Sequence, residues 1–175
     1  MAVVTALRWL VGLFGASPFV LSLPLSRHPW TLFTSVYAHA GPLHLLSNAV
    51  ALVLVGAFLE RRTTRLRFHG FFLATGALAG LAQVTLGGLL ALGPVGVLGA
   101  SGAVFGCLGY LLAGNRVAGG LYDLLPLSPR ATAAVVVVLA GVIVVAASPP
   151  GSALVAHFVG LFLGLVAGRV RLLDA

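Results

Sequence analysis

The sequence predicts an all-α polytopic membrane protein, a bundle of six transmembrane helices with both termini on the cytoplasmic side. Three observations predict this fold class. Hydrophobic residues make up 60% of the 175 positions and charged residues only 7%, whereas soluble domains carry roughly 25% charged residues. Long apolar runs recur along the chain, and the arginines are concentrated in alternate segments between them. We therefore expect one membrane domain covering residues 1–175 and no soluble domain.

Six apolar runs are candidates for helices that cross the hydrocarbon core, which takes about 20 residues. We place these spans near residues 4–23, 43–59, 68–88, 101–115, 131–147 and 153–169. The first run could instead be a signal peptide, because Ala16 and Ser17 supply small residues for cleavage. We prefer a span, since the charged flank of this run is a lone Arg8 and the rest of the chain already has the pattern of a bundle.

The arginines test the number of spans, because basic residues accumulate in loops on the cytoplasmic side. With the N-terminus inside, one arginine, Arg27, lies in an outer segment. The inner segments hold Arg8, Arg61, Arg62, Arg65, Arg67, Arg116, Arg130, Arg169 and Arg171. If the number of spans were wrong by one, the arginines would no longer be concentrated on one side of the membrane. The formal net charge of +7 then indicates membrane lipids with anionic headgroups as partners, and no nucleic acid.

The fourth span is short, which places its first residue below the outer membrane surface. It runs inward from Ser101 for about 15 residues, or ~23 Å, which is less than the hydrocarbon core. The glycine-rich segment 93–99 must then dip into the membrane to reach it. Gly80 and the pair Gly87-Gly88 punctuate the third span, and Pro149-Pro150-Gly151 makes a tight turn before the sixth.

Ser101 stands among small residues where the fourth span begins. A serine in a membrane helix usually packs and bonds to a carbonyl of the preceding turn. Gly99 and Gly102, however, leave space beside this hydroxyl for the backbone of a substrate. Backbone N–H groups at the start of a helix can also hold an oxyanion. Ser101 is therefore a candidate nucleophile, although the string is not the G-x-S-x-G motif, because position 103 is Ala.

His157, about one turn into the sixth span, is the candidate general base. A hydrogen-bonded structural histidine is the alternative. Gly160 and Gly164 follow it, as Gly102 and Gly106 follow Ser101, and such ladders of small residues let two helices pack closely. The Ser101 hydroxyl could then reach a nitrogen of His157. Phe105, one helical turn after Ser101, could stack on the imidazole, although an aromatic residue there is more often part of the core.

An acidic third catalytic residue is not expected. The carboxylates Glu60, Asp123 and Asp174 all fall on the cytoplasmic side of the predicted topology, whereas a triad would need one near the outer leaflet. The expected site is a Ser–His dyad. His44 and Asn48 share one face of the second span, where they either form a polar pair that holds the first span or donate to the oxyanion formed at Ser101.

The other histidines and the cysteine carry weaker signals. We expect His39 to support its loop through hydrogen bonds, and His28 and His69 to lie at the membrane interface. A metal site is not expected, because no carboxylate ligand or H-E-x-x-H motif accompanies the histidines, and no cofactor is indicated. The one cysteine, Cys107, excludes an internal disulfide.

These residues resemble the rhomboid intramembrane serine proteases in their minimal six-span prokaryotic form. The resemblance covers nearly the whole chain and rests on Trp30, His44-x-x-x-Asn48, Glu60-Arg61, Gly99-Ala100-Ser101-Gly102, and His157 with Gly160 and Gly164. It implies that Ser101 is the nucleophile and His157 the general base. It also implies an oxyanion hole made by His44, Asn48 and the Ser101 backbone N–H.

Two departures from the family pattern bear on these roles. Many members carry Trp-Arg where this chain has Trp30-Thr31, so contacts made by that arginine are not expected here. Many bacterial members have Tyr where Phe105 stands, so stacking on His157 survives but the phenolic hydroxyl is lost.

The expected function is hydrolysis of peptide bonds in or near the outer end of transmembrane helices of other membrane proteins. The resemblance implies a multi-pass protein of the prokaryotic plasma membrane whose active site opens to the outer side. Substrates should carry Gly, Pro or other helix-weakening residues near the cut, because a helix hides its carbonyls. The alternatives are a catalytically silent relative that binds transmembrane helices, and a small transporter, which would predict inverted repeats or midplane charges. The sequence does not indicate an oligomeric state.

Overall fold

The computed structural model describes residues 1–13, 18–90, 95–114 and 128–174, and these ranges are mainly helical. The longer helices are α1 (Ala2–Gly12), α3 (Pro42–Leu59), α4 (Arg65–Ala82), α6 (Ser101–Ala113), α8 (Pro129–Ala147) and α9 (Leu154–Arg169). The short elements are the 3₁₀ turn η1 (Leu25–Arg27), α2 (Thr31–Thr34), the π-helical segment η2 (Gln83–Gly87) and α5 (Gly88–Leu90). Within these ranges, β pairing is limited to an isolated antiparallel bridge between Leu21 and Val97. The all-α prediction is therefore confirmed for the described part of the chain.

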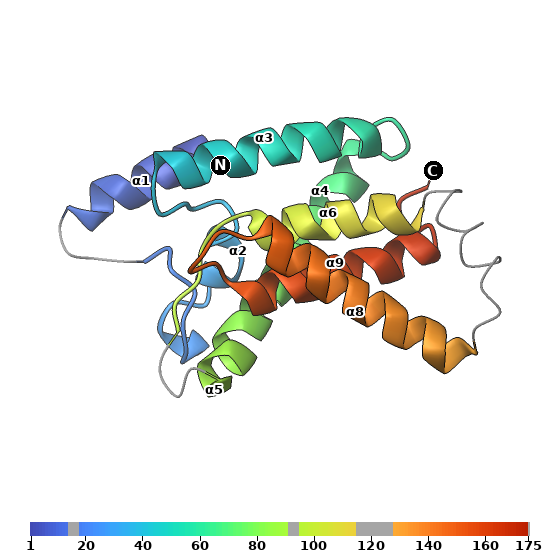
Figure 1. The fold of residues 1–175 in the computed structure, drawn as a ribbon. Coiled ribbons are helices and arrows are strands. Elements are labelled where there is room, and N and C mark those ends of the chain that lie inside the picture. Colours follow the sequence, from blue (N-terminus) through green and yellow to red (C-terminus); the bar gives the residue numbers. More distant parts are fainter. Residues whose placement is uncertain (14–17, 91–94, 115–127, 175) are drawn as a thin grey trace.

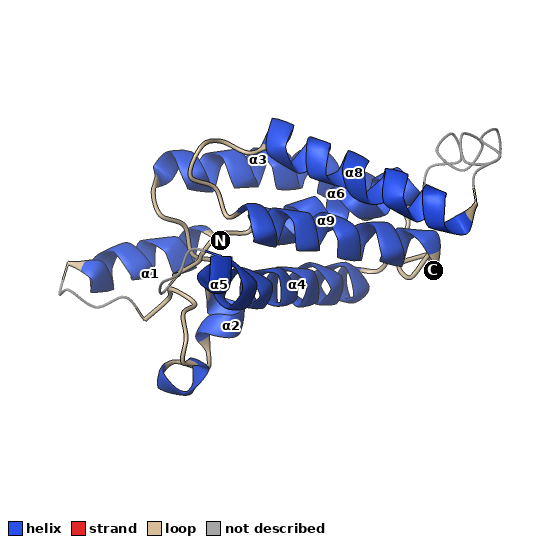
Figure 2. Ribbon diagram, turned by 60° about the horizontal axis from the view of Figure 1, so that its bottom comes forward, coloured by secondary structure: helices blue, strands red, loops and turns tan. Residues whose placement is uncertain are grey.

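Helices α6 and α9 form the centre of the fold and lie side by side (Figures 1 and 2). Their glycines make this possible: a Cβ atom on Gly160 would meet the backbone of Gly102, and one on Gly164 would meet the carbonyl of Gly106. Residues without side chains allow two helix backbones to approach this closely. The contacts advance in the same direction along both helices, so the helices are parallel and their N-terminal ends lie together.

Three further helices surround this central pair. Helix α4 packs against both α6 and α9, while α3 contacts α6 and α8 contacts α9. Phe71 and Phe72 of α4 share a buried cluster with Tyr110 of α6, and Phe105 of α6 packs in a second cluster with Val144 of α8. Few residues of α3 and α8 are buried within the protein, which is the burial expected for helices that face lipid on one side.

Local sequence signals explain where several helices begin. The side-chain oxygens of Thr64 and Ser128 each accept a hydrogen bond, 3.3 Å long, from the backbone N–H three residues further on. Pro42 and Pro129 open α3 and α8, where a missing N–H has no cost. These caps satisfy backbone groups that a helix end would otherwise leave without partners.

Three helical stretches in the described ranges are long and apolar enough to cross a membrane, judged by length and composition: Pro42–Leu59, Arg65–Leu90 and Arg130–Ala147. Three shorter apolar helices, Ala2–Gly12, Ser101–Ala113 and Leu154–Arg169, accompany them. The predicted spans 43–59, 68–88, 101–115, 131–147 and 153–169 all overlap helices of the structure. The central pair α6 and α9 consists of two of the shorter helices.

The prediction of one continuous helix over residues 4–23 is wrong. Helix α1 ends at Gly12, and Leu21 instead pairs with Val97 through two backbone hydrogen bonds of 2.9 Å. Two prolines, Pro18 and Pro24, flank this extended stretch, and proline cannot donate the hydrogen bonds of a continuing helix. An apolar run of sufficient length therefore contains a short helix and, at residues 18–23, non-helical chain.

The structure also places Arg8 differently from the prediction, which grouped it with the inner arginines. The Arg8 guanidinium donates to the carbonyl of His39 at 3.3 Å, and His39 in turn contacts Ala100, the residue before Ser101. Arg67, by contrast, donates to the Asp174 carbonyl near the C-terminus. The physical reason is the length of α1, since 11 residues span only about 16 Å. Predictions for Ala16, Ser17, Gly93, Arg116 and Asp123 lie outside the described residues.

Candidate active site

Ser101 and His157 form a hydrogen-bonded pair at the N-terminal end of the two central helices. Ser101 is the first residue of α6, and His157 lies in the first turn of α9. The distance from His157 Nε2 to Ser101 Oγ is 2.8 Å, and His157 is buried. A hydroxyl and an imidazole at this separation are the arrangement that a nucleophile and a general base require.

Two further side chains fix the imidazole of His157. The ring of Phe105 stacks on it, with centroids 4.6 Å apart and planes 22° from parallel. On the other ring nitrogen, Nδ1 lies 2.7 Å from the hydroxyl of Ser148, the residue that follows α8. Both nitrogens of the imidazole therefore have hydroxyl partners, and its flat face is covered by an aromatic ring.

The chain reaches Ser101 through a backbone bend at Gly99. Its φ of +123° lies in the region that favours glycine. The Gly99 N–H donates to the carbonyl of Ser35 at 2.9 Å, and the next N–H, that of Ala100, donates to His39 Nε2 at 3.4 Å. The loop before α3 thus holds the two residues that precede the candidate nucleophile.

His39 is fully buried at the centre of this loop. Its Nδ1 lies 3.1 Å from Thr5 Oγ1 and 3.2 Å from the Tyr37 carbonyl, while the Thr5 hydroxyl donates to the same carbonyl. Burial, with a smaller contribution from the neighbouring charge of His44, lowers the pKa of His39 to about 4. His39 is therefore neutral at physiological pH, in keeping with its acceptor role toward Ala100.

His44 and Asn48, four residues apart, share one face of α3, and His44 meets the loop before Ser101. The imidazole of His44 packs against Gly99, since a Cβ atom there would lie 2.7 Å from His44 Cε1. The side-chain amide of Asn48, which is buried, donates to the His44 carbonyl at 2.8 Å. His44 is therefore adjacent to the segment that carries Ser101, and Asn48 is oriented by a bond within α3.

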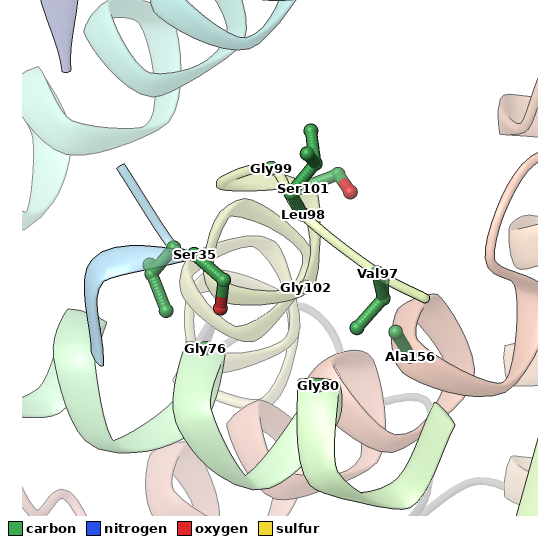
Figure 3. A pocket seen from close by; sticks show the side chains of 10 residues that line it. Ser35, Gly76, Gly80, Val97, Leu98, Gly99, Ser101, Gly102 and Ala156 are labelled. Atoms are coloured by element: carbon green, nitrogen blue, oxygen red, sulfur yellow. The ribbon is translucent and has the colours of Figure 1, made fainter. Parts of the chain in front are cut away.

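A small pocket adjoins Ser101 (Figure 3). Its volume is about 10 Å³, close to the minimum that holds one water molecule. The loop residues Val97 and Gly99 border it, together with Gly76 and Gly80 of α4 and Ala156 of α9. The glycines among these residues allow neighbouring side chains to approach closely, since a Cβ atom on Gly76 would lie 2.8 Å from Val36 and one on Gly80 would lie 3.0 Å from Leu21. Space for a substrate backbone beside Ser101 stays a prediction.

The site contains polar residues that the sequence pattern did not single out. Ser148 contacts His157, Ser35 accepts from Gly99, and Gln83 in the π-helical segment accepts from the Ala156 N–H at 3.1 Å. Each is a polar residue in an apolar neighbourhood, which is the signal that could have identified it. Their contacts depend on how loops meet helices, so helical periodicity gives no sign of them.

The remaining titratable residues lie elsewhere. The Tyr37 hydroxyl bonds to His69 at 2.9 Å, and His28 packs edge-on against Trp30. Glu60 directly follows α3, and the Asp174 carboxylate accepts a hydrogen bond from Tyr110 in the last turn of α6. Among the described residues, no group of three His, Cys, Asp or Glu side chains is placed to hold a metal ion.

Comparison with known proteins gives a family match over most of the chain. A family model described as the Rhomboid domain matches residues 26–173. Rhomboid protease GluP of Bacillus subtilis (strain 168) is 40% identical over 83 residues, which cover 47% of this chain and 15% of that protein. RHOMBOID-like protein 1 of Arabidopsis thaliana is 33% identical over 94 residues, which cover 53% of this chain and 23% of that protein.

A second plant relative extends the same match. RHOMBOID-like protein 7 of Arabidopsis thaliana is 31% identical over 97 residues, which cover 55% of this chain and 29% of that protein. The matched segments thus span less than a third of the length of each of these three relatives.

Proposed function

This chain belongs to the rhomboid family, and from that premise we propose that it is an intramembrane serine endopeptidase that works by a Ser101–His157 dyad. The observation that carries the proposal is the 2.8 Å contact between His157 Nε2 and Ser101 Oγ. The two residues come from separate helices and meet inside an apolar bundle. A buried imidazole such as that of His157 is costly unless its nitrogens have hydrogen-bond partners.

The proposed reaction has two halves. Ser101 Oγ attacks the carbonyl carbon of the scissile bond while His157 Nε2 takes the hydroxyl proton, and the imidazolium then protonates the leaving amine. Water, deprotonated by the same nitrogen, afterwards hydrolyses the acyl-enzyme. Phe105 and Ser148 hold the imidazole in one orientation during both halves.

We assign the oxyanion hole to the Ser101 backbone N–H and to the side chains of His44 and Asn48. The first N–H groups of α6 have no acceptor within their own helix, so they are available to a developing negative charge. His44 is close enough to Gly99 to approach the same position. Asn48 must exchange its bond to the His44 carbonyl, or donate with its second amide hydrogen, to take part.

We further propose that the apolar helices serve as membrane segments, with α1, which is too short to cross the hydrocarbon core, lying at the end where Ser101 opens to the outer side of the plasma membrane. The support is the concentration of arginines around residues 61–67, at the end of α3 remote from Ser101. Single cysteines at Ser26 and Arg62, in a Cys107→Ser background, test this orientation. The cysteine at Ser26 is expected to react from outside and the one at Arg62 from the cytoplasm, and the reverse pattern contradicts the proposal.

The substrates are transmembrane helices of other membrane proteins. A peptide carbonyl in an intact helix is hydrogen-bonded and shielded, so we expect Gly or Pro near the cleaved bond. The pocket beside Ser101 is small and bordered by glycines, which favours a small residue on the acyl side of the cut.

Cleavage in proteoliposomes tests the proposed activity. The purified protein is reconstituted with a single-span model substrate that carries a small residue and a Gly-Pro pair near its outer end. The wild-type protein is expected to cut it, and Ser101→Ala or His157→Ala to reduce the rate by at least about a thousandfold. Ser26→Ala, an exposed serine outside the site, is the matched control and keeps the full rate.

The contrary outcomes separate the alternatives. Cleavage that persists in Ser101→Ala overturns the dyad mechanism. If the wild-type protein binds the substrate without cutting it, a silent helix-binding relative is the better description. If it neither binds nor cuts, the transporter alternative gains support.

A further inference from the structure

Ser148 occupies the position in which many serine hydrolases carry an acidic residue. Its hydroxyl lies 2.7 Å from His157 Nδ1, while the opposite nitrogen of the same ring lies 2.8 Å from Ser101 Oγ. The three side chains therefore form a continuous chain of hydrogen bonds from Ser148 through His157 to Ser101. The carboxylates described in the structure, Glu60 and Asp174, lie at the other end of the helices and cannot fill this place.

The chemistry of the imidazole determines which group donates and which accepts in the contact between His157 and Ser148. A neutral imidazole has one N–H, and a base that accepts from Ser101 at Nε2 must carry its hydrogen on Nδ1. That hydrogen then points at the Ser148 oxygen. When His157 takes the proton from Ser101, both nitrogens become donors, and the Ser148 oxygen remains the acceptor on the Nδ1 side. The hydroxyl thus matches both protonation states that the proposed reaction needs.

The surrounding structure holds Ser148 in place independently of His157. It follows the last residue of α8, whose Ala140 and Val144 are buried in a cluster with Phe105 and Leu161. The turn that follows is closed by a hydrogen bond from the Ser152 N–H to the Pro149 carbonyl at 3.2 Å. The hydroxyl is therefore presented by an anchored helix end and a closed turn.

We propose that Ser148 is a positioning residue that holds the His157 imidazole in the orientation and tautomer in which Nε2 faces Ser101. Stacking on Phe105 sets the plane of the ring. It does not distinguish the two ring orientations that share this plane and differ by a half-turn about the Cβ–Cγ bond. A turned ring would face Ser101 with a carbon atom. The bond to Ser148 distinguishes the two orientations, so this inference rests on the proposed function and deepens it.

The first test separates chemistry from binding. Ser148→Ala is expected to lower kcat for the model substrate about tenfold, as loss of one neutral hydrogen bond to a reacting group predicts, with KM unchanged. The rate of labelling by a small fluorophosphonate probe should fall by the same factor, because labelling needs the activated serine and no peptide binding. Ser148→Thr, which keeps the hydroxyl, should restore most of both rates.

Two controls exclude a merely structural role. Ser152→Ala alters the same turn and is expected to keep the wild-type kcat. The thermal midpoint of Ser148→Ala in detergent should stay within a few degrees of the wild type. A lower midpoint with unchanged kcat and labelling overturns the proposal, as does failure of Ser148→Thr to restore the rates.

A spectroscopic signature tests the tautomer directly. In protein labelled with ¹⁵N-histidine, the His157 signals are identified by their loss in His157→Ala. The wild type is expected to show a protonated Nδ1 and an unprotonated Nε2, and Ser148→Ala to move both signals toward a common average. An identical pattern in both proteins contradicts the proposal. If the wild type is neither labelled nor active, the proposed function fails instead, and the ¹⁵N pattern still decides the role of Ser148.

Discussion

At the scale of single residues, His39 connects three separate parts of the chain. Its Nδ1 contacts Thr5 of α1 and the Tyr37 carbonyl, and its Nε2 accepts from the Ala100 N–H. Protonation would place a hydrogen on Nε2, directly opposite the hydrogen that Ala100 already donates. The neutral form of His39 is therefore the one that holds the loop before Ser101.

The stability of the protein should consequently depend on pH. The pKa of His39 is about 4 in the folded protein and 6.5 in an unfolded chain, so the unfolded state takes up the proton first as the pH falls. The contribution of His39 to stability is fully present well above pH 6.5 and is lost as the pH falls from 6.5 through about 4, an effect on the order of 3 kcal/mol. Thermal unfolding in detergent across this range measures the effect.

Matched histidine variants assign this dependence. His39→Gln should unfold at lower temperature at neutral pH and show a shallower loss of stability below pH 6.5. His28→Gln, which changes an exposed histidine, should retain the wild-type slope. An unchanged slope in His39→Gln would show that other groups cause the pH dependence.

The residues of the site were predictable to different degrees. Ser101 and His157 are predictable from their neighbours, because glycines beside a polar residue in an apolar run indicate a site built around that residue, and Phe105 is predictable from its position one helical turn after Ser101. The structure brings these three together. Ser148 and Gln83 were not found, since their contacts are set by the end of α8 and by a π-helical turn. Neither feature leaves a periodic signal in the sequence.

At the scale of elements, the packing of α6 on α9 determines whether the site exists. A Cβ atom on Gly164 would meet the Gly106 carbonyl, which is backbone and cannot turn aside as a side chain can. The parallel pair holds Ser101 and His157 in register, so any separation of the helices lengthens the 2.8 Å contact. A substitution that separates the two helices should therefore lower both the stability and the activity of the protein.

Gly164→Ala tests this dependence. We expect a loss of about 1–3 kcal/mol in stability, the usual cost of overpacking, together with loss of cleavage. Gly141→Ala is the matched control on α8, where a Cβ atom would meet no other atom within 4 Å. It should be neutral or stabilising by up to about 1 kcal/mol. Thermal midpoints and cleavage rates measure both variants, and a Gly164→Ala protein as stable and active as Gly141→Ala contradicts this view of the pair.

The positions of the helices are predictable from the lengths of the apolar runs, with one exception. Five predicted spans overlap helices of the structure, but the run 4–23 does not continue past Gly12. Hydropathy measures how apolar a segment is and not whether its backbone can form the hydrogen bonds of a continuous helix. The bond between Leu21 and Val97 joins residues far apart in the sequence, and a local pattern cannot report it.

At the scale of the whole molecule, polar groups are divided between the two ends of an apolar bundle. Polar residues from two segments of the chain gather around Ser101 and the loop before it: Ser35, His39 and His44 from residues 35–44, and Ser148 and His157 from residues 148–157. At the other end of the helices, the C-terminal residues bind Tyr110 and Arg67. The family match over residues 26–173 covers both ends. The overall division was predictable from arginine and acid placement, whereas the position of Arg8 was not.

The central claim is that Ser101 is a nucleophile activated by His157, and the site of covalent labelling by a fluorophosphonate tests it most directly. The reconstituted protein is treated with the probe, digested and analysed by mass spectrometry. The proposed mechanism predicts one adduct, on Ser101, with labelling lost in both Ser101→Ala and His157→Ala and retained in Ser26→Ala. An adduct on another residue, or labelling of His157→Ala at the wild-type rate, would contradict it.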